Sequence, residues 1–320
     1  MLALTQRTYG GLGAVTMEDL PVPAPAPDEV LVKVHACSLN GSDRENLAGS
    51  PFYSRLGGLR RPKHPVPGSD IAGVVSAVGA EVGEYAVGDA VFGELAGYRG
   101  GLAEYVATRP ALLARKPPGL TYAEAAAIPQ AGGIAVRAIE GRVTTGDRVL
   151  VNGAGGAGGP FVVGLAAAYG AEVTAVDRGE KADFLRAVGA SAVIDYPGED
   201  WADQGDRYDL IVDLVAHRSP FRVHRALRRS GSYLLVGGST RTLVATLLAG
   251  PMIRATTGKR VGVLVVPQAR EHAESAATAV AEEQMSLHID STFPLSEAVA
   301  AYERLTSGAN HGKIVVVMPE

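Results

Sequence analysis

Apolar and polar residues alternate in short runs over the first third of the chain. Residues 30–36 alternate as a half-buried strand does. Further short apolar runs at 71–79 and 89–93 close on glycine, and four prolines between 21 and 27 predict an extended lead-in. Short strands with frequent glycine indicate a small β barrel or sandwich in residues 1 to about 115.

From about residue 148 onward the apolar runs are unbroken, and helical stretches separate them. Continuous β-branched runs are typical of strands that are buried on both faces of a parallel sheet. The predicted strands are 149–151, 172–176, 192–195, 209–213, 233–236 and 261–266. Helices expected at 160–169, 180–188 and 220–229 would supply the crossovers. This half of the chain is therefore predicted to be a doubly wound α/β domain.

Two changes of pattern indicate domain boundaries. The first follows the Pro-Pro-Gly sequence at 117–119, where Thr121 and Glu124 have the spacing of a capping box that opens a helix. The second precedes a predicted helix at 295–306 and a last apolar strand at 313–317, which we expect to return to the first domain's sheet. The predicted domains are a β-rich domain of residues 1–115 and 285–320 and a nucleotide-binding domain of residues 116–284.

Composition narrows the classes of function. The 320 residues include 30 Lys and Arg against 34 Asp and Glu, a formal charge of −4. A chain without a basic excess has no electrostatic footprint for nucleic acid. The single cysteine, Cys37, excludes an intramolecular disulfide and a multi-cysteine metal site, and it fits a reducing compartment. Because the chain shows no signal-peptide pattern and no apolar run of bilayer length, we expect a cytoplasmic protein that acts away from membranes.

Glycine is unusually frequent, with 40 residues, and its densest cluster carries the first functional signal. Gly153, Gly155 and Gly158 match G-x-G-x-x-G between a buried strand and a predicted helix. In this motif the first glycine permits a tight turn, the second a close approach of backbone to a pyrophosphate, and the third close packing of helix and strand. The helix N-terminus would bind the phosphates, although a plain tight turn is the alternative. The candidate dinucleotide-binding loop comprises Gly153, Ala154, Gly155, Gly156, Ala157 and Gly158.

The charged residues after the next strand bear on the choice of cofactor. Asp177 ends that strand, where a carboxylate can bind both adenosine ribose hydroxyls and repel a 2′-phosphate. Arg178 and Lys181 could instead attract a 2′-phosphate. A solvated charged turn is the alternative for all three residues. The sequence favours NAD(H) and leaves NADP(H) open.

The order of motifs resembles the medium-chain dehydrogenase/reductase superfamily. The motifs that carry the resemblance are the glycine loop and the segments 33–43, 67–73, 88–93, 101–105 and 311–315, which span nearly the whole chain. The resemblance implies a GroES-like catalytic domain with an inserted nucleotide-binding domain. It also implies a homodimer, in which the strand at 261–266 pairs across a twofold axis.

The resemblance also bears on zinc. Zinc-dependent alcohol dehydrogenases place a cysteine where this chain has Asn40, a His-Glu pair where it has Ser69-Asp70, and a second cysteine near Gln130. Neither Asn40 nor Ser69 is a suitable zinc ligand, and a catalytic site normally needs three ligands of the Cys, His or carboxylate type. We therefore expect no metal site.

The chain thus resembles the quinone oxidoreductase-like and enoyl reductase-like branch, which implies reduction of a polarised acceptor. By this resemblance Asn40 lies near the nicotinamide and would donate to a developing enolate or quinol oxygen. Capping of the following turn is the alternative for Asn40. Asp43 is a candidate catalytic acid or base, and a helix cap is the alternative for it. Tyr53 is a candidate proton donor or a wall aromatic. His64 is expected to be a surface residue, and Cys37 a buried small hydrophobe.

Four further residues are candidates for cofactor contact by the same resemblance. Asn310 and Lys313 lie in the terminal motif, and Gly237 with Gly238 ends a later strand and would pack against the nicotinamide ribose. The segment 240–260 is interpreted as a loop of the substrate wall. The basic residues at its two ends, Arg241, Lys259 and Arg260, could meet an anionic group or could form a solvated face.

Three functions follow from these features. The first is a zinc-independent NAD(P)H reductase of an activated double bond or a quinone, with a small-molecule substrate. The second is a zinc-free alcohol dehydrogenase or ketoreductase, which would need a strong acid or base near Asn40. The third is a non-catalytic nucleotide-binding protein, against which the intact glycine loop and Asp177 argue.

Overall fold

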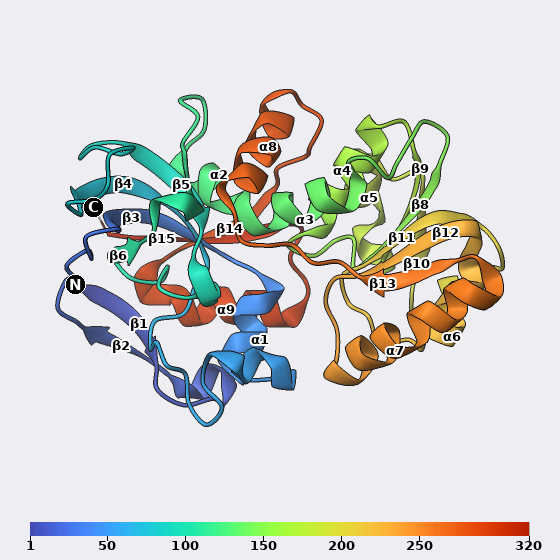
Figure 1. Ribbon diagram of the computed structural model, residues 1–320, viewed down its shortest axis with the longest axis horizontal. Helices are drawn as coiled ribbons and strands as arrows, with labels where there is room; N and C mark the ends of the chain where they lie inside the picture. Colours follow the sequence, from blue (N-terminus) through green and yellow to red (C-terminus); the bar gives the residue numbers. More distant parts are fainter. Residues whose placement is uncertain (320) are drawn as a thin grey trace. The chain divides into compact units, whose positions relative to one another are not determined.

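The computed structural model describes residues 1–319, without the side chain of Tyr98, and it divides them into two compact units (Figure 1). The first unit comprises Met1–Gly133, Pro267–Thr278 and the residues from Leu287 onward, and the second comprises Ile134–Val266 and Ala279–Ser286. Residues 116–133 and 267–278, which the sequence analysis assigns to the nucleotide-binding domain, thus pack in the first unit.

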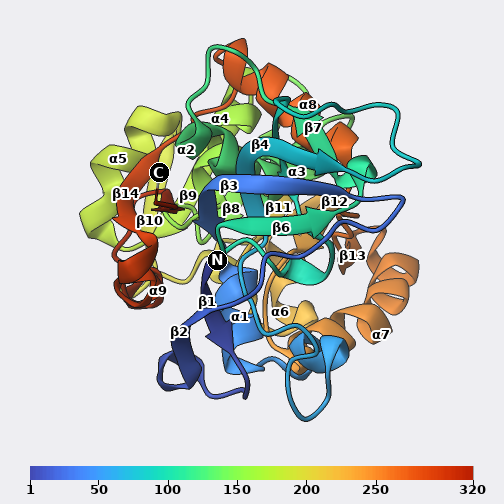
Figure 2. The ribbon, with the colours of Figure 1, turned by 90° about the vertical axis from the view of Figure 1, so that its left-hand side faces the viewer.

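The first unit is built on a seven-stranded, mostly antiparallel sheet. Its order is β14-β15-β3-β4-β5-β7, and β6 also pairs with β3, as Figure 2 shows. The strands are β3 (Val30–Leu39), β4 (Asp70–Val78), β5 (Ala90–Glu94), β6 (Tyr105–Thr108), β7 (Leu113–Arg115), β14 (Ile289–Pro294) and β15 (Lys313–Val317). A separate hairpin joins β1 (Leu2–Gln6) to β2 (Val15–Asp19). The prediction of a GroES-like β-rich domain is confirmed.

The last strand returns to the sheet of the first unit, as the sequence predicts. β15 runs antiparallel to β3, with Val316 opposite Cys37 (Figure 1). Cys37 is fully buried in the core beneath this sheet, which also contains Leu39, Ile71 and Tyr302. Because β15 pairs with the strand that ends at Leu39, it brings Lys313 to the carboxyl end of β3.

Helices of the first unit begin and end at recognisable caps. The Thr121–Glu124 capping box is confirmed, since Thr121 Oγ1 accepts from the Glu124 backbone N–H at 3.2 Å. The helices are α1 (Gly41–Ala48), α2 (Tyr122–Ala127) and α9 (Ala298–Ser307), while α3 (Pro129–Ile139) and α8 (Arg270–Ala281) contribute residues to both units. The 3₁₀ turns are Gly11–Ala14, Phe52–Gly57, Ala96–Tyr98, Pro110–Leu112 and Leu295–Glu297.

The second unit is a doubly wound α/β structure, as predicted. Its parallel sheet has the order β10-β9-β8-β11-β12-β13. The strands are β8 (Arg148–Asn152), β9 (Glu172–Asp177), β10 (Ala192–Asp195), β11 (Tyr208–Asp213), β12 (Leu227–Leu235) and β13 (Arg260–Val263). The helices are α4 (Gly159–Ala168), α5 (Ala182–Val188), α6 (Pro220–Val223) and α7 (Thr240–Thr257), with 3₁₀ turns at Gly179–Lys181, Trp201–Asp203 and His224–Ala226. The strand order reverses beside β8, so the glycine loop lies at the switch point where such sheets bind ligands.

Two expected element ends in this unit are wrong, and so is one expected loop. The helix expected at 220–229 ends at Ala226, because Leu227 and Tyr233 are buried in the sheet as part of β12. The strand expected at 261–266 ends at Val263.

The segment 240–260 is not a loop but mostly the 18-residue helix α7. Ser239 caps its start by accepting from the Thr242 N–H at 3.1 Å, and Gly258, at φ 74°, ends it. Its threonines and the internal Pro251 are poor helix formers, which conceals the helix in the sequence.

Candidate functional site

The predicted site residues fall into two groups, one in each unit. The dinucleotide-binding loop and its acidic partner belong to the second unit, and the residues around Asn40 belong to the first. We describe each group by itself.

The backbone accommodates only glycine at one position of the candidate dinucleotide-binding loop and at the residue that follows it. Gly153 has a φ of 82°, and the N–H groups of Gly153 and Ala154 both donate to the Val176 carbonyl, at 3.0 and 3.1 Å. A Cβ on Gly159 would lie 2.1 Å from the Ala154 carbonyl oxygen, whereas a Cβ on Gly158 would meet no atom within 4 Å. The assignment of close helix–strand packing to Gly158 is therefore wrong, and Gly159 has that role.

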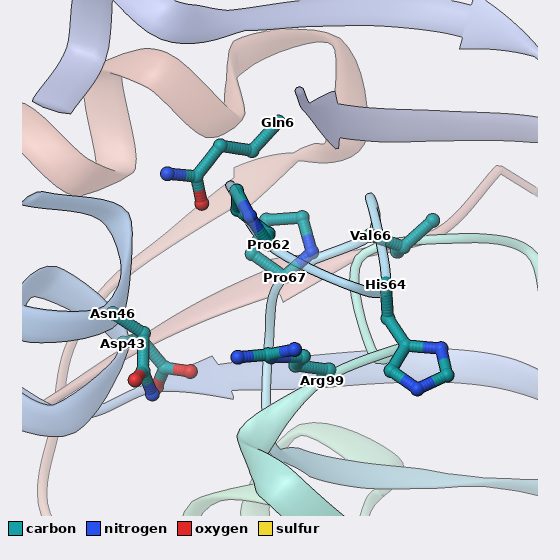
Figure 3. Close-up of a pocket in the computed structure, with 8 residues that line it drawn as sticks. All are labelled: Gln6, Asp43, Asn46, Pro62, His64, Val66, Pro67 and Arg99. Atoms are coloured by element: carbon teal, nitrogen blue, oxygen red, sulfur yellow. The ribbon is translucent and has the colours of Figure 1, made fainter. Parts of the chain in front are cut away.

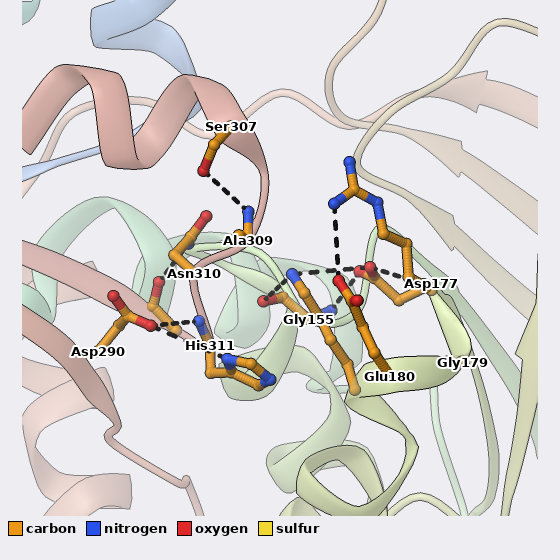
Figure 4. Close-up of polar contacts among 12 residues, drawn as sticks. Gly155, Asp177, Gly179, Glu180, Asp290, Ser307, Ala309, Asn310 and His311 are labelled. Atoms are coloured by element: carbon orange, nitrogen blue, oxygen red, sulfur yellow. Dashed lines mark hydrogen bonds and ion pairs between the residues drawn. The ribbon is translucent and has the colours of Figure 1, made fainter.

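Asp177 holds the loop in shape. Its Oδ2 accepts from the Gly155 N–H at 2.7 Å and its Oδ1 from the Arg178 N–H at 2.9 Å (Figure 4). Lys181 is buried and donates to the Gly155 carbonyl at 3.2 Å, with its ammonium 3.7 Å from Asp177 Oδ1. Arg178 pairs with Glu180 at 3.6 Å. A carboxylate and an ammonium thus clamp the peptide groups on either side of Gly155.

The carboxyl ends of three neighbouring strands meet at a buried acid that the sequence analysis missed. Asp213, at the end of β11, accepts from Asn152 Nδ2 and from the Tyr233 hydroxyl, each at 2.8 Å. Burial raises the pKa of Asp213. Its signal in the sequence is an acid that ends a continuous apolar run, as Asp177 does.

Gly237 and Gly238 follow β12 in close contact with the segment after β11. A Cβ on Gly237 would lie 2.6 Å from the Leu214 carbonyl oxygen, and one on Gly238 would lie 2.4 Å from that of Ala216. Both glycines are therefore required by close backbone packing. They lie beyond the carboxyl ends of the parallel strands, as the glycine loop does.

In the first unit, the Asn40 side chain hydrogen-bonds to three other side chains in a buried polar network. It is 4% exposed, follows β3 and caps α1. Its Oδ1 accepts from the Lys313 ammonium at 2.6 Å, and its Nδ2 donates to Asp70 Oδ2 at 3.0 Å and to Ser69 Oγ at 3.3 Å. Both amide hydrogens thus have protein acceptors, and donation to a substrate oxygen requires the longer contact, to Ser69, to open.

Lys313 and Asp70 form a buried ion pair beside Asn40. Both side chains are fully buried, and the ammonium lies 3.5 Å from Asp70 Oδ2. Burial raises the pKa of Asp70, and the charge of Lys313 opposes this. An ion pair at this depth is held by its hydrogen bonds, because desolvation of both charges costs several kcal/mol.

The turn before Lys313 is fixed by two side chains. Asn310 Nδ2 donates to the Gly312 carbonyl at 2.7 Å, and Asp290 Oδ1 accepts from the His311 N–H at 2.8 Å (Figure 4). Burial alone would raise the pKa of Asp290, but the bonds from Arg304 and His311 outweigh it and lower that pKa to about 2. Asn310 therefore fixes the turn that leads into Lys313. Contact of Asn310 or Lys313 with a cofactor stays a prediction.

Asp43 completes the capping box of α1. Its Oδ2 accepts from the Asn40 N–H at 2.8 Å and from Ser69 Oγ at 3.4 Å, while its buried Oδ1 has no hydrogen-bond partner among the described residues. Burial and the neighbouring Asp70 raise the pKa of Asp43 to about 7. The helix cap expected as one reading of Asp43 is confirmed.

A small pocket opens beside Asp43 (Figure 3). His64, expected to be a surface residue, is exposed and lines this pocket. The lining residues are Gln6, Asp43, Asn46, Pro62, His64, Val66, Pro67 and Arg99.

Glu94 is the acid of the first unit that the sequence analysis missed. It ends β5 directly opposite Asp70 of β4. Gln130 joins the two acids, because its backbone N–H donates to Asp70 Oδ2 at 3.2 Å and its Nε2 donates to Glu94 Oε1 at 2.7 Å. Ser42 Oγ donates in turn to Gln130 Oε1 at 2.8 Å. The sequence signal is weak, since it consists only of an acid at the end of a predicted strand.

Tyr53 lies in the 3₁₀ turn Phe52–Gly57, where its hydroxyl donates to Glu45 Oε2 at 3.1 Å. Burial raises the pKa of Glu45. Cys37 is fully buried, as expected, and burial raises the pKa of its thiol.

The donor set at Asn40 does not fit zinc. Asn40, Ser69 and Asp70, and Gln130 do converge, as the resemblance implies, but they offer amides and a hydroxyl, and the Asp70 carboxylate is paired with Lys313. Within residues 1–319, no group of three or more His, Cys, Asp or Glu side chains has an arrangement that could hold a metal ion.

None of the helices in these residues combines the length and the apolar character that crossing a membrane requires.

Comparison with known proteins identifies the family of the chain. The family profile "Alcohol dehydrogenase GroES-like domain" matches residues 26–118, and the profile "Zinc-binding dehydrogenase" matches residues 188–316. The chain is 33% identical to the chloroplast envelope quinone oxidoreductase homolog of Arabidopsis thaliana, over 99% of this chain and 98% of that protein.

Two further similarities are informative. The chain is 37% identical to the chloroplastic NADPH-dependent alkenal/one oxidoreductase of Arabidopsis thaliana, over 67% of this chain and 57% of that protein. The solved structure of the quinone oxidoreductase from Coxiella burnetii superposes with a TM-score of 0.88 at 28% identity, covering 100% of this chain and 99% of that one.

The buried ion pair yields a stability prediction. Lys313→Met leaves the Asp70 carboxylate buried without its cation, so we expect the free energy of unfolding at pH 7 to fall by about 3–5 kcal/mol. The double variant Lys313→Met/Asp70→Asn should recover most of this loss. Urea titration followed by circular dichroism measures both, with Lys33→Met as the control at a part-exposed lysine of β3.

The pH dependence follows from the sign of the shift. Removing Lys313 raises the folded-state pKa of Asp70 further above its unfolded value. The destabilisation is then full above that folded-state pKa and fades as the pH falls through it toward the unfolded value. A loss no larger than that of Lys33→Met, or one that is independent of pH, would contradict the assignment.

Proposed function

The chain belongs to the medium-chain dehydrogenase/reductase family, and we propose that it is a zinc-independent, NAD(P)H-dependent reductase. Its acceptor would be a small molecule, either an activated carbon–carbon double bond or a quinone. The first unit would form the catalytic domain and the second unit the nucleotide-binding domain. The cytoplasmic location expected from the sequence stays a prediction.

One observation carries this proposal. The positions at which zinc-dependent relatives place their ligands hold Asn40, Ser69 and Gln130, and a fully buried cation, Lys313, bonds to Asn40. Without a Lewis acid the oxidation of an alcohol is difficult, whereas reduction of an already polarised acceptor is feasible. The names of the relatives, quinone and alkenal/one oxidoreductases, support the same acceptor classes.

The dinucleotide-binding loop fits the pyrophosphate of a nicotinamide dinucleotide. It lies at the switch point of the sheet, the space beside Gly158 is open, and α4 begins at once with Gly159 and Pro160. When bound there, the reduced cofactor would supply a hydride. Asp177 and Lys181 would hold the loop in the binding shape through their contacts with Gly155.

Asn40 and Lys313 would stabilise the oxygen that becomes negative when the acceptor receives the hydride. A cation 2.6 Å from the Asn40 carbonyl polarises the amide and makes its N–H groups stronger donors. The longest of the Asn40 contacts, to Ser69 at 3.3 Å, is the one that a substrate oxygen would replace. Donors aimed at a developing oxyanion are commonly the largest single contribution to catalysis.

Hydride tracing tests this function. With 4-deuterated NADH or NADPH and an enone, we expect oxidation of the cofactor and deuterium on the β-carbon of the product, because the acceptor is attacked at its electrophilic carbon. Mass spectrometry and NMR of the product measure this, and a quinone is the parallel acceptor. Deuterium on the carbinol carbon would support the ketoreductase alternative. Binding of cofactor without oxidation by any acceptor would support the non-catalytic one.

We propose that NADH is the preferred cofactor. The carboxylate of Asp177 would repel a 2′-phosphate, and the two nearby bases are already paired, Arg178 with Glu180 and Lys181 with Asp177. Asp177→Asn keeps an acceptor for the Gly155 N–H but removes the charge. We expect the NADPH to NADH ratio of kcat/KM to rise by about tenfold, a change of 1.4 kcal/mol.

Steady-state kinetics with both cofactors measures this ratio. Asp183→Asn, at an exposed residue of the same unit, is the matched control. A wild-type preference for NADPH, or a ratio that Asp177→Asn leaves unchanged, would overturn the NADH preference without affecting the proposed reaction.

We further propose a homodimer formed by the β13 edge of the second unit. β13 is the last strand of its sheet, and α7, which packs beside it, exposes Val244, Leu247, Leu248 and Met252 on one helical face. Val265, just beyond β13, is 69% exposed. An apolar patch at a sheet edge is typical of a twofold interface.

Leu248→Glu should weaken this dimer, because it places a charge in the centre of the apolar face. We expect the dissociation constant to rise by about tenfold or more, since a buried unpaired charge costs more than 1.4 kcal/mol. Sedimentation velocity over a concentration series measures it, with Val87→Glu, at an exposed residue of the first unit, as the control. A wild-type monomer at all concentrations would refute the interface.

A further inference from the structure

We propose that Glu94 is the acid that returns a proton to the α-carbon of a substrate reduced at its β-carbon. The inference rests on the proposed function and adds to it the proton donor. It is carried by the place of Glu94 in the sheet, by the two amides that hold it, and by the charges around it.

Glu94 and Asp70 are cross-strand neighbours. Asp70 begins β4 and Glu94 ends β5, and the two residues lie opposite each other in the antiparallel register. Two like charges directly opposite each other destabilise a sheet. Asp70 is the one with a cation, because Lys313 pairs with it. Glu94 is therefore the member of the pair that stays protonated.

Two glutamine amides determine which oxygen of Glu94 carries the proton. Gln130 Nε2 and Gln268 Nε2 both donate to Oε1, at 2.7 and 3.3 Å. The orientation of the Gln268 amide follows from its other contacts, because its Oε1 accepts from the Gly97 N–H and its Nε2 also donates to the Leu95 carbonyl. Oε1 must then be the acceptor, and the proton belongs on Oε2. The side chain is half-buried rather than sealed in the core.

The charges that face Glu94 agree with this protonation state. Asp70 and Asp43 are both acidic neighbours, and the cation Lys313 is bound to Asp70 and Asn40. From β7, Arg115 pairs with Asp89, and α2 packs with buried alanines, Ala125 to Ala127. Burial and Asp70 raise the pKa of Glu94 to about 8, against the lowering effect of the two glutamine donors. A group of this kind is an acid at neutral pH and suits general acid catalysis.

The other acids of the first unit are less suited. Asp43 is almost fully buried, and its Oδ2 already accepts from Asn40 and Ser69. The Tyr53 hydroxyl donates to Glu45. Among the described acids of this unit, Glu94 alone combines a raised pKa, partial exposure and membership of the Asn40 network through Gln130.

The proton step balances as follows. The hydride forms the new C–H bond at the β-carbon of an enone, and the π electrons move onto the carbonyl oxygen as an enolate. The O–H bond of Glu94 then breaks as the enolate forms a C–H bond at its α-carbon. Glu94 is left as a carboxylate and takes a proton from water. A reduced quinone is protonated on oxygen, which water does readily, so it depends less on this acid.

Glu94→Gln tests the step through a comparison of the two acceptors. We expect the ratio of enone to quinone turnover to fall by at least about tenfold, because general acids typically contribute about 10²–10⁴-fold. In D₂O the wild type should place deuterium on one face of the α-carbon, and the variant should lose that selectivity. Glu81→Gln, at an exposed glutamate of the same unit, is the matched control.

The pH profile gives a second test with a defined sign. Because protonated Glu94 is the active form, enone reduction should fall as the pH rises through about 8. Gln268→Leu removes a donor that favours the carboxylate, so this limb should move to higher pH. Infrared difference spectra of wild type minus Glu94→Gln at pH 7, without any acceptor, should show the carbonyl band of a protonated carboxyl.

The outcomes separate the two proposals. Retention of the enone to quinone ratio and of α-face selectivity in Glu94→Gln would overturn the role of Glu94 while leaving the reductase function intact. Absence of the protonated-carboxyl band would overturn it independently of activity. If the wild type transfers hydride to neither acceptor, the proposed function fails and this step fails with it.

Discussion

The bond between the Lys313 ammonium and Asn40 is the interaction on which the rest of the first unit depends. It joins the first residue of β15 to the residue that follows β3 and caps α1. Asp70, from β4, neutralises the lysine and accepts from the Asn40 amide. Strands from three distant parts of the sequence thus meet at the Lys313 ammonium. A buried charge costs much free energy unless it is paired and hydrogen-bonded, so its partners must be held in place.

The Lys313–Asp70 ion pair lies among two further acids of the first unit, Asp43 and Glu94. Burial and the neighbouring charge of Asp70 raise the pKa values of both Asp43 and Glu94. Gln130 completes the arrangement by donating to Asp70 and Glu94 together. The region that corresponds to the zinc site of zinc-dependent relatives therefore contains amide side chains, one ion pair and two acids with raised pKa values. Such a set can stabilise an oxyanion and move a proton, which are the needs of a reductase of polarised acceptors.

The sequence predicts best what is local. The glycine loop, the acid at the end of the next strand and the capping box at Thr121 are each encoded within a few residues, and the structure contains all three. The return of β15 is predictable because a lone apolar strand needs a sheet. Glu94, Gln130 and Gln268 are far apart in the chain, and no local pattern announces that they meet. The helix α7 is hidden by its threonines and Pro251, and Gly158 and Gly159 differ only in what lies next to them in space.

We propose that Lys313 and the amides of Asn40 and Gln130 act where zinc-dependent relatives hold a metal. The most direct measurement is the rate of enone or quinone reduction by protein dialysed against a chelator, with metal content determined by mass spectrometry. The account predicts an unchanged rate at less than about one tenth of a zinc ion per chain, because the donors at Asn40, Ser69 and Gln130 do not suit zinc. A rate that falls with the metal and returns on addition of zinc would contradict it.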